Sequence, residues 1–407
     1  MIALPVAGPF SRLRFERSAD WLAAALAASL PWSTSATSIL AALWLVALLP
    51  TLDVASLRRI FAMPAAWLPV ALFLLAALGL AWGGNLPWNE RIAGLAQFAK
   101  FLAIPLLLFQ FARSDHGEWP LKAFFVSATV LLAYSWLVLI FSDLPSRGFP
   151  RGVPVKDYVI QSGIFALCAL VLFDRAVTAS RCEQWRHALG MAAVGVVFLL
   201  NVAFVATART TLVTLAVLLA LLGLRHFTRL QLLVFFTSVV LCAVLAWTSS
   251  PYLRERVVHI PAEIEASDPS ADTSVGARLY FWRQSVAFIA GAPLIGHGTG
   301  SIREMFRRSA ADPAREQASN PHNQVFAVGI QLGCIGIAVL VALWVAHMWL
   351  FVGAGALEWI GLAVVVQNVV GSLFNSHLFD FTHGWLYVLG VGIVGGMVIR
   401  RRAQTKS

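Results

Sequence analysis

Residues 322–350 read HNQVFAVGIQLGCIGIAVLVALWVAHMWL, an apolar run that follows a long polar segment. The run contains no Asp, Glu, Lys or Arg, and it exceeds the roughly 20 residues with which a helix spans a bilayer. Because lipid offers no partner for backbone N–H and C=O groups, such a run is expected to be helical. This stretch therefore predicts a membrane-spanning helix with His322 at its outer end.

Similar apolar runs recur along the whole chain. Of its 407 residues, 59% are apolar and only 12% are charged, which is far from the composition of a soluble domain. We predict an all-α integral membrane protein with about twelve transmembrane helices and one large outer loop. The predicted spans are 19–32, 36–50, 65–82, 92–112, 121–142, 158–177, 188–206, 210–224, 231–249, 322–350, 356–375 and 383–400.

The formal net charge of +10 comes largely from arginines in short connections and tails. These are Arg12, Arg14, Arg17, Arg58, Arg59, Arg113, Arg175, Arg181, Arg186, Arg225, Arg229, Arg400, Arg401 and Arg402. Twelve spans place all of these connections on one side of the membrane, as the positive-inside bias requires, with both termini cytoplasmic. This distribution argues against nucleic acid as a partner.

The chain divides into residues 1–250 with helices one to nine, an outer loop at 251–321, and residues 322–407 with the last three helices and a cytoplasmic tail. The loop carries eight basic and eight acidic residues, so its charge is balanced. Within it, residues 276–286 have the apolar spacing of an amphipathic helix. Residues 291–300 are rich in glycine and are expected to form a flexible, turn-rich part of a lid.

His322 is the candidate with the clearest chemistry. It would project from the outer end of the span at 322–350, and arginines cluster upstream of it. Their positive charge disfavours the imidazolium form, which leaves a neutral imidazole at neutral pH. A general base requires that state. A histidine that only caps the helix or lies at the membrane interface is the alternative interpretation.

Arg209 lies in the turn ATARTT, residues 206–211, between two predicted spans. A helix that begins near Thr210 would direct its free N–H groups and its dipole toward the guanidinium group, an arrangement that suits an anion. An interface arginine that extends to water is the alternative. Arg147, Arg151 and Lys156 lie in the outer connection after the fifth span, where positive charge opposes the topology bias and indicates either a phosphate ligand or a solvated loop.

Two further outer segments contribute candidates. Arg278 and Trp282 are one turn apart on the predicted helix at 276–286, so they share one edge of it. Asp380, flanked by two histidines, lies in the turn between the last two spans, where it is placed to orient His322 or a sugar hydroxyl. A hydrogen-bonded turn residue is the alternative for Asp380.

The sequence lacks several motifs of other enzyme classes. It contains no DxD-like acidic pair, no HExxH, no P-loop and no GxSxG. Metal-dependent glycosyl transfer and acyl-enzyme chemistry therefore lack their usual residues, and we expect neither a metal nor a cofactor.

Taken together, these features resemble the O-antigen ligase and polymerase superfamily of bacterial inner-membrane glycosyltransferases. The resemblance rests on HN at 322–323, followed after nine residues by GxxG at 333–336. It also rests on the arginine turn at 206–211 and on the Arg, Trp, Pro and spaced glycines of 278–300. It covers roughly residues 200–380, whereas the N-terminal half is similar only in being apolar.

The resemblance implies a GT-C-like fold in the inner membrane of a Gram-negative bacterium, with the site facing the periplasm. The implied donor is O-antigen on undecaprenyl diphosphate, and the implied acceptor is a hydroxyl of lipid A–core oligosaccharide, among membrane lipids. By position, His322 is the base, and Arg209 and Arg278 bind the diphosphate without a metal. The remaining candidate substrate-binding residues are Arg147, Arg151, Lys156, Trp282, Asn323 and Asp380.

One base without a nucleophilic carboxylate pair favours single displacement with inversion at the anomeric carbon. A single large outer loop without an added soluble domain favours a ligase within the superfamily. An O-antigen polymerase or a protein O-oligosaccharyltransferase is the alternative. A transporter of a lipid-linked sugar or an anion fits less well, because the ionisable candidates lie at the ends of spans rather than near the midplane.

Overall fold

The computed structural model describes residues 9–141, 143–144, 152–258, 274–309 and 320–405, and its regular structure over these ranges is helical. The first half contains α1 (Pro9–Ser29), α2 (Thr34–Leu48), η1 (Leu49–Thr51), α3 (Val54–Phe61), α4 (Pro64–Leu78), α5 (Trp88–Ala99), η2 (Lys100–Leu102), α6 (Ala103–Phe111), α7 (Glu118–Ile140), α8 (Tyr158–Arg181) and α9 (Trp185–Phe204). The second half contains α10 (Arg209–His226), α11 (Arg229–Ser249), α12 (Pro251–Val258), α14 (Ser274–Gly291), α15 (Ile302–Ser309), α16 (Gln324–Leu350), α17 (Ala356–Ser372), α18 (Phe381–Leu389), η3 (Gly390–Val394) and α19 (Gly395–Gln404).

Each of the twelve predicted spans overlaps a helix or a continuous series of helices. Within the described residues, nine helices are long and apolar enough to cross a membrane. The pair α3 and α4 forms a tenth candidate that bends by 87° between its two parts, and α17 is apolar but shorter. The fold is thus that of a helical integral membrane protein, while the count of twelve spans stays a prediction.

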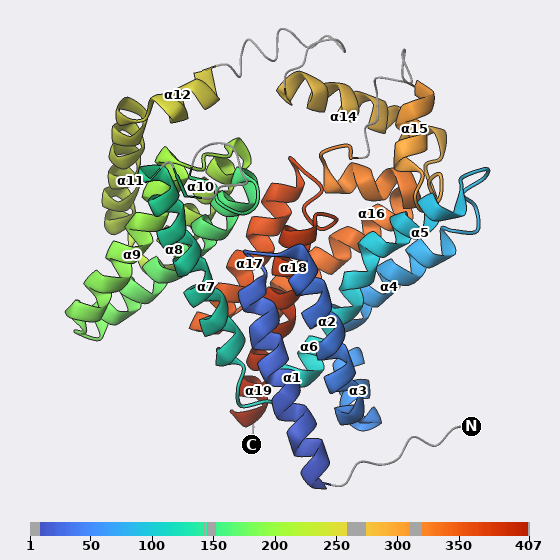
Figure 1. Cartoon of the computed structure of the whole chain (residues 1–407), viewed down its shortest axis with the longest axis horizontal. Coiled ribbons are helices and arrows are strands. Elements are labelled where there is room, and N and C mark those ends of the chain that lie inside the picture. Colours follow the sequence, from blue (N-terminus) through green and yellow to red (C-terminus); the bar gives the residue numbers. More distant parts are fainter. Residues whose placement is uncertain (1–8, 142, 145–151, 259–273, 310–319, 406–407) are drawn as a thin grey trace.

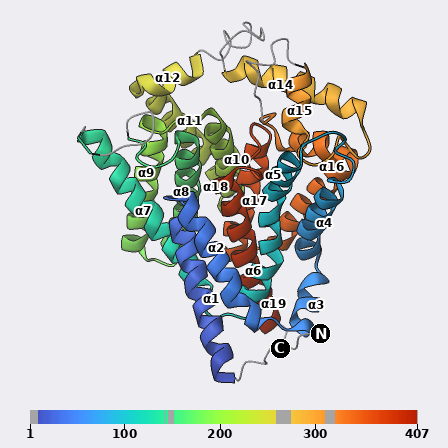
Figure 2. The same ribbon diagram turned by 45° about the vertical axis from the view of Figure 1, so that its right-hand side comes forward.

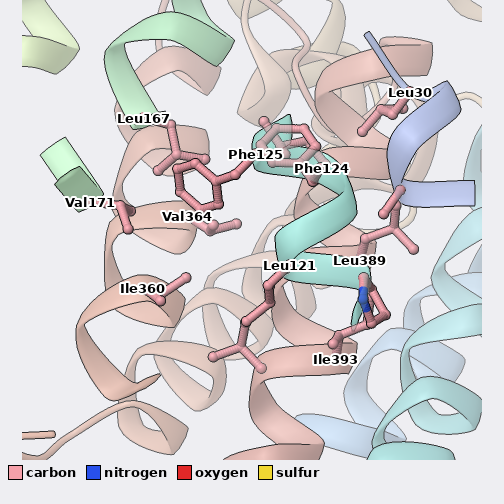
Figure 3. Close-up of a pocket in the computed structure, with 15 residues that line it drawn as sticks. Leu30, Leu121, Phe124, Phe125, Leu167, Val171, Ile360, Val364, Leu389 and Ile393 are labelled. Atoms are coloured by element: carbon pink, nitrogen blue, oxygen red, sulfur yellow. The ribbon is translucent and has the colours of Figure 1, made fainter. Parts of the chain in front are cut away.

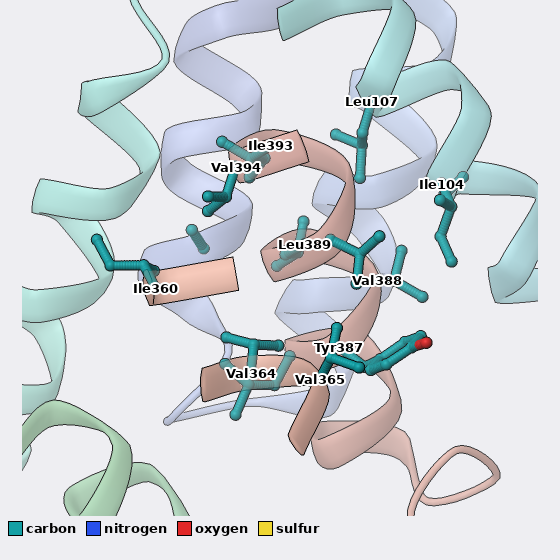
Figure 4. Close-up of a cluster of buried hydrophobic side chains, with 14 of the residues drawn as sticks. Ile104, Leu107, Ile360, Val364, Val365, Tyr387, Val388, Leu389, Ile393 and Val394 are labelled. Carbon is teal, nitrogen blue, oxygen red and sulfur yellow. The ribbon is translucent and has the colours of Figure 1, made fainter. Parts of the chain in front are cut away.

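The last helical series forms the centre of the bundle. α18, η3 and α19 follow one another without a break, and η3 is a turn of π-helix. Gly390 and Gly392 allow Val364 of α17 and Leu107 of α6 to approach the backbone closely. Figure 4 shows side chains of α6 and α17 gathered around this series.

The bundle has two distinct ends. α12, α14 and α15 lie at one end, which we call the loop end, and the start of α1 and the end of α19 lie at the other, the terminal end (Figures 1 and 2). At the terminal end, Arg113 pairs with Glu16 and Asp53 at 3.0 Å each, and Arg225 pairs with Asp174 at 2.9 Å. Arginines of the short connections are therefore engaged with acidic residues at this end.

A small apolar cavity of about 40 Å³ opens between α1, α7, α8, α17, α18 and η3. Leu30, Phe124, Leu167 and Val364 are among the side chains that line it (Figure 3). The described residues of its lining carry no polar side chain. Because such a surface offers no group for acid–base chemistry or for charge stabilisation, the candidate site lies elsewhere.

α16 is broken at Gly333, whose φ of 63° and ψ of −161° are not helical. In an unbroken helix, the N–H groups of residues 334 and 335 would donate to the carbonyls of Ile330 and Gln331. The loop after α14 replaces these partners. The His297 N–H donates to the Ile330 carbonyl at 2.8 Å, and the Gly298 N–H donates to the Gln331 carbonyl at 3.0 Å.

The other side of the break is completed by the same loop. The Cys334 N–H donates to the Pro293 carbonyl at 2.7 Å, and the Ile335 N–H donates to the Leu294 carbonyl at 3.2 Å. Four backbone hydrogen bonds therefore hold the loop against both halves of α16. The prediction that residues 291–300 form a flexible part of a lid is wrong, because their backbone supplies hydrogen bonds that a buried helix needs.

The same loop is also wedged against α4. Gly298 has a φ of 93°, and a side chain at this position would collide with the backbone of Gly83. The Thr299 N–H donates to the Gly79 carbonyl at 3.1 Å, and the Thr299 hydroxyl donates to the Ala76 carbonyl at 2.6 Å. The glycines therefore serve close approach between backbones, and they fix the end of α14 on the bundle.

Gly298→Ala should lower the Tm of the detergent-solubilised protein. The left-handed conformation costs an alanine about 1–2 kcal/mol, and its Cβ would also meet the backbone of Gly83. Gly190→Ala in α9 is the matched control, because open space surrounds that position and alanine favours a helix. An unchanged Tm for Gly298→Ala would contradict the docked loop.

Candidate active site

His322 lies in the turn that leads into α16. Its backbone has a φ of 52°, which is uncommon for a residue other than glycine, and its N–H donates to Asn320 Oδ1 at 2.9 Å. The next residue, Asn323, caps α16, because its side-chain oxygen accepts from the N–H groups of Val325 at 2.9 Å and Phe326 at 3.2 Å. Two asparagine side chains thus fix the backbone on either side of His322.

A second turn, residues 373–380 between α17 and α18, contacts the His322 ring. Nδ1 of His322 lies 3.1 Å from Asn375 Oδ1. Nδ2 of Asn320 donates to the same oxygen at 3.1 Å, and the Ser376 hydroxyl donates to Asn320 Oδ1 at 2.7 Å. The two turns are therefore joined by a closed set of hydrogen bonds around one side of the imidazole.

α14 supplies the other side of the site and confirms a helix at 276–286. The prediction that this helix is amphipathic is wrong, because its apolar residues do not gather on one side and Val286 is exposed. The Phe281 ring stacks near His322 with centroids 6.1 Å apart and planes 29° apart. Trp282 contacts Phe326 of α16 edge to face at 6.1 Å. Arg278 stands one turn before these two aromatic residues, so α14 brings a guanidinium group and aromatic rings to the imidazole.

The pKa of His322 is lowered from its ordinary value. Burial is the largest cause, and the positive charge of Arg278 adds to it, while the hydrogen bond to Asn375 acts in the opposite direction. The imidazole is therefore neutral at neutral pH and carries a lone pair on one nitrogen. Arg278 and His322 are 44 positions apart in the sequence, yet the fold brings them close enough for the charge of Arg278 to lower the pKa of His322.

Asp380 lies in the turn between α17 and α18, as predicted, and its contacts are those of the hydrogen-bonded turn residue given as the alternative interpretation. Its carboxylate caps α18 by accepting from the His383 N–H at 2.8 Å, and it also contacts His383 Nδ1 at 3.1 Å. His377 stacks on His383 with centroids 4.1 Å apart and planes 4° apart. The side chain that hydrogen-bonds the His322 ring is Asn375, whereas the sequence had indicated Asp380.

Lys156 joins the same polar region from the connection before α8. Its Nζ donates to the Leu30 carbonyl and to the Thr382 hydroxyl, both at 2.7 Å. Burial lowers the pKa of Lys156 to about 8, although the charges of Asp380 and Asp157 raise it. The ammonium group is thus held close to the turn that carries Asp380.

Arg209 is the first residue of α10 and is half-buried. Ala208 precedes it and provides no side-chain cap for the helix. α10 packs against α8 and α17, whereas α14, which carries Arg278, packs against α16. Since α16 also packs against α17, the helices that carry the two arginines are linked through α16 and α17. Arg147 and Arg151 lie outside the described residues.

Of the polar residues around His322, Asn323 was a candidate from the sequence, whereas Asn320, Asn375 and Ser376 were not predicted to be functional. Asn375 and Ser376 form a short polar run between two apolar spans, and Asn320 comes two residues before the candidate base. The sequence feature that could have identified these residues is their position in predicted turns, close in sequence to a histidine. Their uncharged amide and hydroxyl groups did not mark them as functional.

A family model described as O-antigen ligase matches residues 194–341. The matched region begins in α9, includes Arg209, Arg278 and His322, and ends within α16 after Gly333. The turn at 373–380 lies outside it. No curated protein matches the chain significantly.

Asn323→Ala should destabilise the protein by about 1 kcal/mol, because α16 would lose its N-cap. Asn323→Ser should recover most of the loss, because a serine hydroxyl also caps a helix. Thermal unfolding of both variants in the same detergent measures the difference. Equal Tm values for the alanine variant and the parent protein would exclude the capping role.

Proposed function

Because the match over residues 194–341 makes this chain a member of the O-antigen ligase and polymerase superfamily, we propose that it is an O-antigen ligase. In this proposal it transfers O-antigen polysaccharide from undecaprenyl diphosphate to a sugar hydroxyl of lipid A–core. The observation that supports it best is the His322 imidazole, which is held by Asn375 on one side and is close enough to Arg278 for that charge to lower its pKa.

The proposed reaction is a single displacement. The acceptor hydroxyl oxygen attacks the anomeric carbon of the donor while His322 takes the hydroxyl proton. The bond from the anomeric carbon to the diphosphate oxygen breaks, and its electron pair leaves with undecaprenyl diphosphate. Arg278 and Arg209 neutralise the charge that develops on the leaving group, so the proposed mechanism requires no metal and inverts the anomeric carbon.

The proposed orientation places the loop end in the periplasm and the terminal end in the cytoplasm. Arginines and their acidic partners at the terminal end support it, because short cytoplasmic connections are enriched in Lys and Arg. Residues 251–321 then form a periplasmic segment between the helices of 1–250 and those of 322–407, in the inner membrane of a Gram-negative bacterium.

Some of the other candidate substrate-binding residues lie near the His322 site, and others lie outside the described residues. Lys156 and Asp380 belong to the polar region beside the 373–380 turn, and Trp282 lies on α14 next to the residue that contacts His322. We retain these three as candidates for contacts with the glycan or the diphosphate. Arg147 and Arg151 remain candidates on sequence grounds alone.

The superfamily also includes O-antigen polymerases, and the family match does not separate them from ligases. We prefer the ligase because one large segment, residues 251–321, separates the helices of 1–250 from those of 322–407. A protein O-oligosaccharyltransferase would use the same donor with a different acceptor. A transporter is disfavoured, because the candidate residues lie in turns, at helix starts and on α14 rather than in the middle of the long apolar helices.

His322→Ala should reduce glycan transfer by at least about 100-fold, which is the lower part of the range for general-base catalysis. Binding of the lipid-linked donor should persist, because the guanidinium groups remain. His187→Ala is a suitable control, since His187 is exposed at the start of α9 in the terminal half of the bundle. Transfer by His322→Ala at the parental rate would remove the proposed base.

Purified protein with a lipid-linked glycan, assayed with and without lipid A–core, separates the candidate functions. A ligase should form product only when the core is present. Lengthened lipid-linked chains in its absence would instead identify a polymerase. No transfer to any acceptor in detergent, with the donor still bound, would favour the transporter.

A further inference from the structure

The hydrogen bonds around Asn375 fix which of its side-chain atoms is the oxygen. The Ser376 N–H donates to this atom at 2.9 Å, and a backbone N–H has no lone pair with which to accept. The atom must therefore be an acceptor, which in an asparagine side chain is Oδ1. The neighbouring amide of Asn320 is fixed by the same reasoning, because the His322 N–H donates to its Oδ1 at 2.9 Å.

The position of this oxygen determines the tautomer of His322. An amide oxygen only accepts hydrogen bonds, so Nδ1 of His322, 3.1 Å away, must carry a proton. In a neutral imidazole the other nitrogen, Nε2, then carries the lone pair. We propose that Asn375 is the positioning residue that holds His322 in the Nδ1–H tautomer and presents Nε2 to the acceptor hydroxyl.

The surrounding structure supports the role of Asn375 in orienting the His322 ring. His322 has an unfavourable positive φ, and such a conformation persists only where neighbouring contacts determine it. Asn320 and Ser376 both donate to Asn375 Oδ1, so the oxygen is held by two donors besides the imidazole. The ring is therefore oriented through a network that spans two turns far apart in the sequence.

An asparagine also differs from a carboxylate in its effect on the base. A carboxylate beside Nδ1 would favour the imidazolium form and would raise the pKa of His322, whereas a neutral amide fixes the tautomer with a smaller effect. Among the described residues, Arg278 on α14 is the charged group that acts on His322, and the turn that carries Asn375 also carries His377 and Asp380. Arg278 is the one whose charge lowers the pKa of His322.

This inference depends on the proposed function, because it assigns Asn375 to the base of that reaction. Asn375→Asp is the decisive variant. Its carboxylate can accept from Ser376, Asn320 and His322 as the amide oxygen does, so the described hydrogen bonds to this oxygen are retained. Because His322 acts as a base only above its pKa, the acid limb of the kcat/KM profile should move to higher pH by about one unit.

Asn375→Ala should lower kcat by roughly 10- to 100-fold with little change in KM for the lipid-linked donor, because the tautomer is no longer fixed. An aspartate variant with a normal Tm and an unshifted acid limb would overturn the proposal, and so would an alanine variant with parental kcat. If the alanine variant does not fold, the aspartate profile alone decides. His322→Ala in the same assay tests the base itself, so failure of the proposed function is recognised separately.

Discussion

A helix that breaks inside an apolar bundle must find new partners for its backbone, and this requirement organises the functional half of the molecule. Gly333 interrupts α16, and residues 293–298 supply the two donors and two acceptors that the break requires. Because Thr299 also bonds to the end of α4, the loop joins α4, α14 and α16. The position of Arg278 relative to His322 follows from this attachment, since one belongs to α14 and the other opens α16.

The site is assembled from short turns rather than from one element. The turn at 320–323 presents His322, and the turn at 373–380 orients its ring through Asn375. Amide and hydroxyl groups form the described hydrogen bonds around His322, and the charge of Arg278 acts on its imidazole. This arrangement keeps the imidazole neutral and places a guanidinium group near it. The proposed transfer reaction needs both, because a neutral imidazole can accept a proton and a guanidinium group can stabilise the leaving diphosphate.

The sequence predicted the helices well, because lipid leaves an apolar run little choice of structure and Pro and Gly mark many of its ends. It also indicated Arg278 and His322, since charge and motif spacing identify such residues. It failed where the outcome depends on pairing in three dimensions. The glycines at 291–300 were expected to be flexible, although they permit close contact between backbones. Asp380 was considered as a partner for His322, whereas Asn375, which contacts the ring, was not considered.

The order of these segments along the chain has a consequence for biogenesis. The loop that completes α16 is synthesised before α16 itself, so its carbonyl and N–H groups have already emerged when the broken helix enters the membrane. α4, against which the loop packs, is made earlier still. Circular permutation that moved residues 291–300 behind α16 would reverse this order of synthesis.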